Sequence, residues 1–149
     1  MATERVYEGN DPLVPGCPPA GYAIACAAAS ANLDLILKER LLQRLPPKVH
    51  RLANALQELY EIPQVGDIRQ CGLIVGIEIV RDPTSKESFD LDRRIGERIV
   101  GEARKRGTLL RARGDVMLLV PAPGISVTDL QELVRILQES IRSVIGSEK

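Results

Sequence analysis

Residues 65–80 of the chain, VGDIRQCGLIVGIEIV, form two β-rich runs that meet at Cys71-Gly72. Successive side chains of a strand point to opposite faces of a sheet, so an apolar residue at every second position indicates a strand with one buried face. In the second run this spacing is met by Leu73, Val75, Ile77 and Ile79. The stretch therefore predicts a hairpin whose second strand lies in the core.

Helical periodicity precedes this hairpin. The Ala-rich segment from Gly21 to about Leu45 predicts a first helix, which Pro46-Pro47 should interrupt. A second helix is predicted from about Pro47, because proline is tolerated in the first turn of a helix. The apolar residues of this second helix recur at helical spacing and are Val49, Leu52, Ala53, Leu56 and Tyr60.

A second helix–hairpin–helix succession follows the first hairpin. A third helix is predicted over about 91–106, stopped by Gly107, with an apolar stripe of Leu91, Ile95, Ile99 and Ala103. Two short β runs follow, around 108–112 and 115–120, with a turn centred on Gly114-Asp115. The last helix opens with a capping box at Ser126 and ends near Gly146. Its stripe consists of Leu130, Leu133, Val134, Leu137, Ile141 and Val144.

The order of these elements, ααββαββα, predicts a two-layer α/β domain of the α+β kind. Helices should cover one side of a small, mostly antiparallel sheet. This domain is expected over residues 21–149. Residues 1–20 should form an extended or disordered lead-in, because Pro12, Pro15, Pro18 and Pro19 deny that segment regular structure.

Composition excludes several classes of partner. Twenty basic residues balance twenty acidic ones among 149, and aromatic residues make up 3%, so nucleic acid is not an expected ligand. No apolar run approaches the length that spans a bilayer, so a membrane is not expected either. Three cysteines without a CxxC pair indicate reduced thiols and a cytoplasmic protein. With one histidine, no metal constellation is predicted.

A cluster of basic residues at 104–113 contains the main candidate for ligand binding, Arg111. A guanidinium holds a carboxylate through two parallel hydrogen bonds and stays charged at any working pH. The local composition alone favours a plainer reading, in which Arg111 belongs to a solvated basic surface together with Arg104, Lys105, Arg106 and Arg113.

Several stretches together resemble the C-terminal part of class III, pyridoxal-phosphate-dependent aminotransferases. They are ANLDLI, VGDIRQCGLIVGIEIVRDPTSKESF, EARKRG and LLRARGDVMLLVPAP, and the resemblance runs from about Gly21 to Ile145. The particular residues of these motifs favour the branch of the family that acts in biotin synthesis. The resemblance implies the small C-terminal domain of a fold-type I transferase, and it implies that Arg111 grips the substrate carboxylate.

The resemblance also implies that the cofactor machinery lies elsewhere. The family's Schiff-base lysine and cofactor aspartate fall upstream of the matched region, so no catalytic residue is assigned here. None of the five lysines has the apolar surroundings that would activate it: Lys38, Lys48, Lys86, Lys105 and Lys149. The family's phosphate-contact position corresponds to Pro18, which offers neither a hydroxyl nor a backbone N–H. Pyridoxal 5'-phosphate binding by this chain alone is therefore not expected.

Two functions are compatible with this sequence. In the first, the chain is a fragment or subunit of an aminotransferase that moves an amino group from S-adenosylmethionine to 8-amino-7-oxononanoate, not catalytic alone, with a lysine-bearing large-domain polypeptide as its partner. In the second, it is a non-catalytic remnant that acts as an oligomerisation or interaction module through its Ala-rich first helix.

Overall fold

The computed structural model describes residues 22–147, in the element order that the sequence predicts. The described chain falls into two units, one ending at Leu41 and the other beginning at Leu42. The predicted lead-in over residues 1–20 lies outside the described residues. No helix within residues 22–147 is long and apolar enough to cross a membrane.

The first unit contributes one helix, α2 (Ala23–Lys38). Its end is set by Arg40, whose φ of 48° lies in the left-handed region and stops the helical path. The prediction that this helix continues to Leu45 is therefore wrong. Taken by itself, α2 buries none of its side chains, and large apolar residues such as Ile24 and Leu37 are exposed.

Helix α3 (Leu41–Gln57) contains Pro46 and Pro47 within its length, so the predicted interruption at the proline pair is also wrong. A proline removes one N–H and crowds the carbonyl four residues earlier. Both prolines lie in the second turn of α3, where the affected carbonyls belong to the exposed residues Leu42 and Gln43 and remain accessible to water. A 3₁₀ turn, η1 (Glu58–Glu61), follows the helix.

The buried stripe of α3 differs at its end from the predicted one. Leu52 and Leu56 are buried as expected, but Tyr60 is 47% exposed and Leu59 is fully buried instead. Leu52, Leu56 and Leu59 follow the i, i+4, i+7 spacing of one helical face, whereas Tyr60 lies to one side of that face. The Tyr60 hydroxyl instead accepts a hydrogen bond from the backbone N–H of Ile68, at 3.2 Å.

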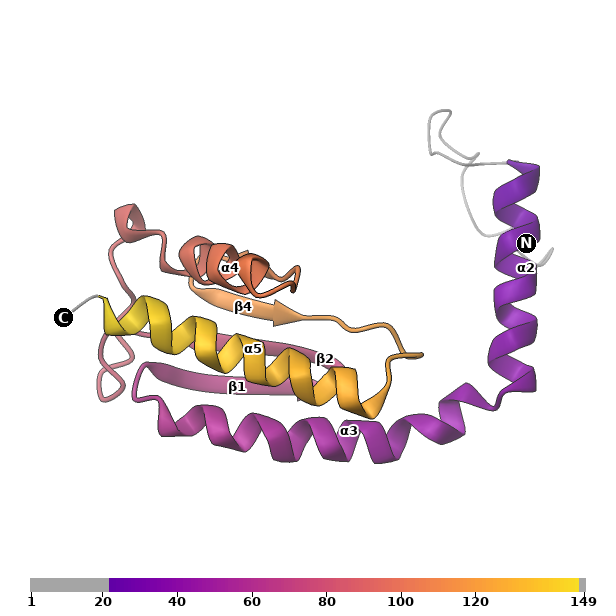
Figure 1. Cartoon of the computed structure of the whole chain (residues 1–149), viewed down its shortest axis with the longest axis horizontal. Coiled ribbons are helices and arrows are strands. Elements are labelled where there is room, and N and C mark those ends of the chain that lie inside the picture. Colours follow the sequence, from indigo (N-terminus) through magenta and orange to yellow (C-terminus); the bar gives the residue numbers. More distant parts are fainter. Residues whose placement is uncertain (1–21, 148–149) are drawn as a thin grey trace, which may run out of the picture. The chain divides into compact units, whose positions relative to one another are not determined.

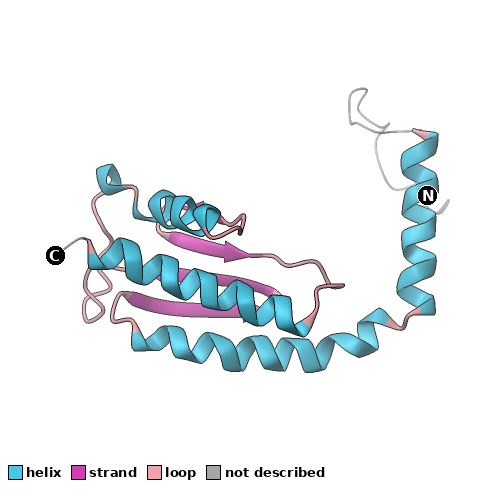
Figure 2. Cartoon of the chain, viewed as in Figure 1, coloured by secondary structure: helices cyan, strands magenta, loops and turns pink. Residues whose placement is uncertain are grey.

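Four antiparallel strands form the sheet in the order β1-β2-β4-β3 (Figure 2). They are β1 (Val65–Cys71), β2 (Ile74–Ile79), β3 (Arg111–Arg113) and β4 (Val116–Leu119). The turn between β1 and β2 depends on Gly72, whose φ is +62°. The two hairpins are confirmed, although β3 begins later than the predicted run at 108–112.

Helices α4 (Ile95–Lys105) and α5 (Val127–Gly146) lie over one face of this sheet, and α3 runs along the β1 side (Figure 1). The predicted alternation is confirmed, because Leu73, Val75, Ile77 and Ile79 are all buried. They pack with Met117 and Leu119 of β4 and with buried residues of the helices in one hydrophobic core. The structure is therefore an α/β fold with helices on one side of a small antiparallel sheet.

Of the two helices that cover the sheet, α4 begins later than predicted. Leu91 lies in a separate 3₁₀ turn, η2 (Leu91–Arg93), and is 89% exposed, so its predicted place on the α4 stripe is wrong. Arg94, with φ 48°, separates this turn from α4. At α5 the prediction is confirmed, because the Ser126 hydroxyl accepts a hydrogen bond from the Asp129 backbone N–H at 3.0 Å.

Candidate functional site

The sheet face turned away from the buried side chains carries most of the candidate chemistry, and we call it the open face. Residues directly opposite one another on paired strands share a face, so the register defines its membership. None of its members is buried. They are Asp67, Arg69, Cys71, Ile74, Gly76, Glu78, Arg111, Arg113, Val116 and Leu118.

Charge on the open face is divided between its two edges. On the β1 side, Arg69 lies between two carboxylates, 3.4 Å from an oxygen of Asp67 and 3.8 Å from an oxygen of Glu78. On the β3 side stand Arg111 and Arg113, which form no side-chain hydrogen bond or ion pair with any described residue. The cationic charge at the β3 edge is therefore available to a ligand.

Strand β3 is held in place by a close contact between helix α4 and the β3–β4 turn. A Cβ atom on Gly96 would lie 2.0 Å from the carbonyl oxygen of Gly114, so only glycine allows the helix to approach this near. Asp115 reinforces the contact by accepting a hydrogen bond from the Gly96 backbone N–H at 3.3 Å. Gly114 itself has a φ of +58°, which allows the tight turn.

Arg111 borders two grooves beside the β3 edge. One groove, of about 400 Å³, lies against α4 and includes Glu97 and Arg104. The other, of about 620 Å³, is mainly apolar and is lined by Leu109, Leu110, Leu118, Leu119, Val120, Pro121, Ile125 and Leu133 in addition to Arg111. This second groove joins one unpaired guanidinium to an apolar wall, which suits a ligand with a carboxylate and an aliphatic body.

The loop that forms the far side of the apolar groove is fastened to α3 by a lysine. The Lys48 ammonium donates hydrogen bonds to the backbone carbonyls of Pro123, at 3.0 Å, and Ile125, at 2.7 Å. These bonds hold the segment after β4 in place without using a side chain of the loop itself. Lys48 thus has a structural role, and it helps to define the groove beside Arg111.

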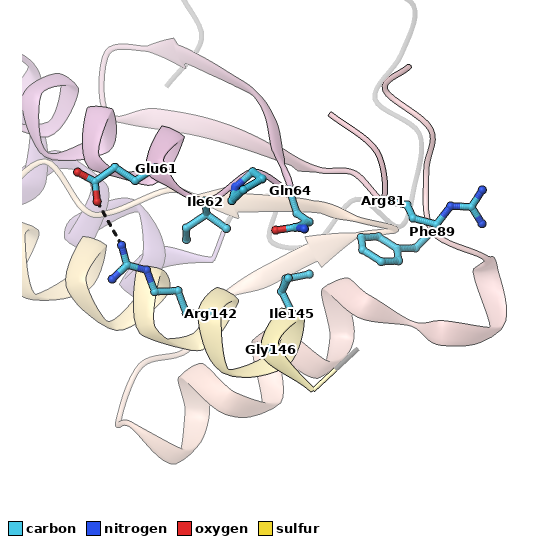
Figure 3. Close-up of a pocket in the computed structure, with 9 residues that line it drawn as sticks. Glu61, Ile62, Gln64, Arg81, Phe89, Arg142, Ile145 and Gly146 are labelled. Carbon is cyan, nitrogen blue, oxygen red and sulfur yellow. Dashed lines mark hydrogen bonds and ion pairs between the residues drawn. The ribbon is translucent and has the colours of Figure 1, made fainter. Parts of the chain in front are cut away.

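A further groove, of about 400 Å³, lies where α5 ends beside the start of β1 (Figure 3). Its apolar lining includes Ile62, Phe89 and Ile145, and two arginines stand at its rim. Both arginines are already paired. Arg142 lies 3.3 Å from an oxygen of Glu61, and a hydrogen bond to Glu87 raises the pKa of Arg81. Because carboxylates already neutralise its rim, this groove suits an anion less well than the groove at Arg111.

Four of the five lysines lie within residues 22–147, where the structure shows the setting of each. A site for pyridoxal phosphate needs a lysine that can form a Schiff base and donors for a phosphate. Lys38 and Lys86 are exposed, Lys105 bonds Glu102 at 2.5 Å, and Lys48 is bound to two carbonyls. Lys149 and Pro18 lie outside the described residues. Within residues 22–147 no group of three or more His, Cys, Asp or Glu side chains is arranged to hold a metal ion.

Sequence reasoning named Arg111 as a candidate but did not predict the residues that surround it. Leu109 and Val120 at the groove are 78% and 68% exposed, which is unusual for large apolar side chains. The signal was present in the runs Leu109-Leu110 and Leu118–Val120, which place apolar residues on both faces at one end of the hairpin. The contact between Gly96 and Gly114 left no comparable pattern, since it joins residues that are distant in sequence.

Comparison with known sequences identifies what the chain is similar to. Residues 2–141 match the profile of the aminotransferase class-III family, farther toward the N-terminus than the predicted start of the resemblance near Gly21. An adenosylmethionine-8-amino-7-oxononanoate aminotransferase of Nitratidesulfovibrio vulgaris is 44% identical over 124 residues, covering 83% of this chain and 23% of the relative. The enzyme of the same name from Geobacter sulfurreducens is 43% identical over 153 residues, covering 98% of this chain and 34% of the relative.

Solved structures give the same result. The crystal structure of the adenosylmethionine-8-amino-7-oxononanoate aminotransferase of Methanocaldococcus jannaschii matches 79% of this chain and 27% of its own, with a TM-score of 0.77 and 33% identity. A PMP-bound aminotransferase from Vibrio fluvialis matches 81% of this chain and 27% of its own, with a TM-score of 0.77 and 26% identity. The chain thus spans 23% to 34% of the length of these relatives.

Proposed function

The chain belongs to the class-III aminotransferase family, and on that premise we propose that it supplies the carboxylate-binding portion of a pyridoxal-phosphate-dependent aminotransferase active site. The observation that carries this proposal is the unpaired Arg111 guanidinium at the rim of an apolar groove of about 620 Å³. When bound, the cofactor carries the amino group between substrates and acts as an electron sink. Its lysine and phosphate donors come from a larger polypeptide domain outside residues 22–147.

Arg111 has two tasks in this proposal. Its planar fork donates two parallel hydrogen bonds to the substrate carboxylate, which fixes both the position and the orientation of that end of the molecule. The β3–β4 hairpin prevents the fork from drifting, because Gly96 and Asp115 tie the hairpin turn to α4. A substrate held at its carboxylate presents its reacting group at a fixed distance, where the cofactor-bearing domain must place the pyridoxal ring.

The proposed substrate is 8-amino-7-oxononanoate, with S-adenosylmethionine as the amino donor, as in the enzymes that share 43% to 44% identity with this chain. In this keto acid a run of methylenes separates the carboxylate from the reacting groups. The apolar wall formed by residues such as Leu118 and Leu119 lies beside Arg111 and is suited to such a run. S-adenosylmethionine carries its carboxylate on the carbon that bears the reacting amino group, so we assign the Arg111 fork to the keto acid.

The test supplies the missing portion in trans. The N-terminal two thirds of the Geobacter sulfurreducens relative would be co-produced with this chain, and aminotransferase activity assayed with pyridoxal phosphate, S-adenosylmethionine and 8-amino-7-oxononanoate. The wild-type chain should restore activity. Arg111→Ala should lower kcat/KM for the keto acid about 30- to 1000-fold, because a charge-assisted bidentate pair is lost. This factor corresponds to a loss of transition-state stabilisation of roughly 2–4 kcal/mol.

Arg51→Ala is the matched control for this test. Arg51 is exposed on α3 and likewise has no side-chain partner among the described residues, so its loss changes the net charge equally and should leave kcat/KM unchanged. A chain that neither binds the large domain nor gains activity from it contradicts the proposal as a whole. Equal activity of Arg111→Ala and wild type removes Arg111 from the site.

A second candidate function, a non-catalytic interaction module, is favoured by helix α2. Considered by itself, this helix exposes Tyr22, Ile24, Leu33, Leu35 and Leu37, each more than half accessible to solvent. These apolar side chains are distributed around the helix, and a helix that is apolar on several sides is typical of one that other segments or chains cover. As an oligomerisation module, the chain should sediment as a dimer or larger species in analytical ultracentrifugation. A monodisperse monomer across a wide concentration range contradicts this second function.

A further inference from the structure

We propose that Arg113 acts together with Arg111 as a two-guanidinium site for small dianions, and that Arg113 is the residue that selects for a second oxyanion group on the ligand. The inference rests on the proposed function only for the carboxylate site at Arg111, and its ligand class is distinct from the two proposed substrates, each of which carries a single carboxylate. It assigns a specificity-determining role to a residue that the sequence analysis placed in a solvated basic surface.

The register of the sheet places both arginines on one face. Ala112, between them, is half-buried and pairs with Met117, which is fully buried on the core side. Arg111 and Arg113 therefore both project on the open face, and both are exposed. Two residues apart along a strand, their Cα atoms are separated by roughly 6.6 Å. Arginine side chains on that spacing can hold two oxyanions of one small molecule at the same time.

The carboxylates that could neutralise these two arginines are already engaged elsewhere. Asp67 and Glu78, in the cross-strand row of Arg113, are shared by Arg69 at 3.4 and 3.8 Å. Glu97, in the groove beside Arg111, pairs with Arg94, which immediately precedes α4. Asp115, in the β3–β4 turn, accepts the Gly96 backbone N–H at 3.3 Å. Two adjacent like charges thus remain without a described counter-charge.

The immediate neighbours of the pair on β4 are apolar. Leu118 lies opposite Arg111, and Val116 lies opposite Arg113. Neither side chain can accept a hydrogen bond, so neither competes with a ligand for the guanidinium donors. Their apolar surface is suited to pack against the methylene stems of the two exposed arginines.

A dianion gains from this arrangement in a way that a monoanion does not. One carboxylate occupies the Arg111 fork, while the second lies within reach of Arg113 and relieves the repulsion between the two cations. The matching ligand class is a short α,ω-dicarboxylate, or an acid whose second oxyanion lies a few bonds from its carboxylate. Recognition here is binding alone and involves no bond-making step.

The experiment titrates the full chain with glutarate and, separately, with butyrate, which has a similar aliphatic chain and one carboxylate fewer. Arginine side-chain N–H signals are followed by NMR at low ionic strength and at equal sodium concentration. In the wild type, glutarate should bind about three- to fivefold more tightly than butyrate. This factor is what one exposed charge pair, between the second carboxylate and Arg113, typically contributes to affinity. Arg113→Gln should abolish that advantage and leave butyrate binding unchanged within twofold. Arg51→Gln is the matched control and should change the affinity for neither acid.

The outcomes separate this inference from the function on which it rests. Suppose that Arg111→Gln weakens the binding of both acids, but glutarate still binds more tightly than butyrate in Arg113→Gln. The proposal of a dianion site is then wrong, and the proposal of a carboxylate site at Arg111 stands. If butyrate binding does not respond to Arg111→Gln, the carboxylate site itself is wrong, and the dianion site falls with it. If Arg51→Gln reduces the glutarate advantage as much as Arg113→Gln does, the acids are attracted non-specifically to the charged surface. That result also overturns the inference.

Discussion

The two faces of one sheet behave as different regions of this molecule. On the covered face, Val75, Ile77 and Met117 are completely buried beneath helices α4 and α5. On the open face, Arg69, Arg111 and Arg113 are exposed, and no residue is buried. Because side chains alternate along a strand, the same three-residue strand β3 places Ala112 toward the core and two arginines on the open face. Stability and the proposed binding are thus divided by face and not by segment.

The comparison implies that substitutions on the two faces should differ in kind. Covered-face changes should alter the free energy of unfolding, while open-face changes should alter binding with little effect on stability. The division is incomplete at one place. Gly96 and Asp115 belong to the packing of α4, yet they hold the hairpin that carries Arg111.

The largest expected effect comes from a truncation at the centre of the covered face. Ile77→Ala should lower the free energy of unfolding by about 3 kcal/mol, because it removes fully buried methylene groups and leaves a cavity. Leu118→Ala, one strand away on the open face and only half-buried, should cost about 1 kcal/mol or less. Urea denaturation followed by circular dichroism measures both values. Equal losses for the two variants contradict the division by face.

An intermediate effect is expected at the contact between α4 and the hairpin turn. In Gly96→Ala the new Cβ would lie 2.0 Å from the Gly114 carbonyl oxygen, so the helix and turn must separate, at a cost of about 2 kcal/mol. Gly101→Ala is the matched control on the same helix. No atom lies within 4 Å of its new Cβ, and the better helix propensity of alanine should stabilise the protein by about 0.5–1 kcal/mol.

These two glycine variants also test whether α4 positions the arginines. The NMR signals of Arg111 and Arg113 should shift in Gly96→Ala and remain in place in Gly101→Ala. Denaturation curves recorded on the same samples measure the opposite signs of the stability change. A neutral or stabilising Gly96→Ala means that the turn can yield without cost, and the proposed coupling between α4 and β3 is then wrong.

The smallest expected effect concerns charge on the outer side of a covering helix. Hydrogen bonds from Lys105 and then Arg106 lower the pKa of Glu102 below its ordinary value. A carboxylate whose pKa is lower in the folded state stabilises the fold above its unfolded pKa and loses that contribution as the pH falls through the folded pKa. Wild type should therefore be slightly more stable than Glu102→Gln at neutral pH, and the difference should vanish as the pH falls through the lowered pKa of Glu102 in the folded state. A difference that persists at acid pH contradicts this origin.

Local sequence predicted much of the fold because its signals were local. The alternation in β2, the turn glycines at positions 72 and 114, and the Ser126 cap each depend on neighbours within a few residues, and all are found in the structure. The errors arose where a local rule met the rest of the chain. Pro46 and Pro47 predict an interruption of the helix, yet α3 continues through them and packs Leu52 and Leu56 into the core. Leu91 fitted the helical stripe, yet Arg94 turns the chain before α4 begins.

The sequence by itself determined the order of elements, the buried side of β2, and Arg111 as a candidate to bind a carboxylate. Only the tertiary structure decided that Arg111 stands beside an apolar groove, and that the carboxylates around Arg111 and Arg113 are occupied by other partners. The register between β3, β4 and β2 and the approach of Gly96 to Gly114 bring together residues that are far apart along the chain. Periodicity reports which face a residue occupies, but pairing and packing between distant segments decide what lies next to it.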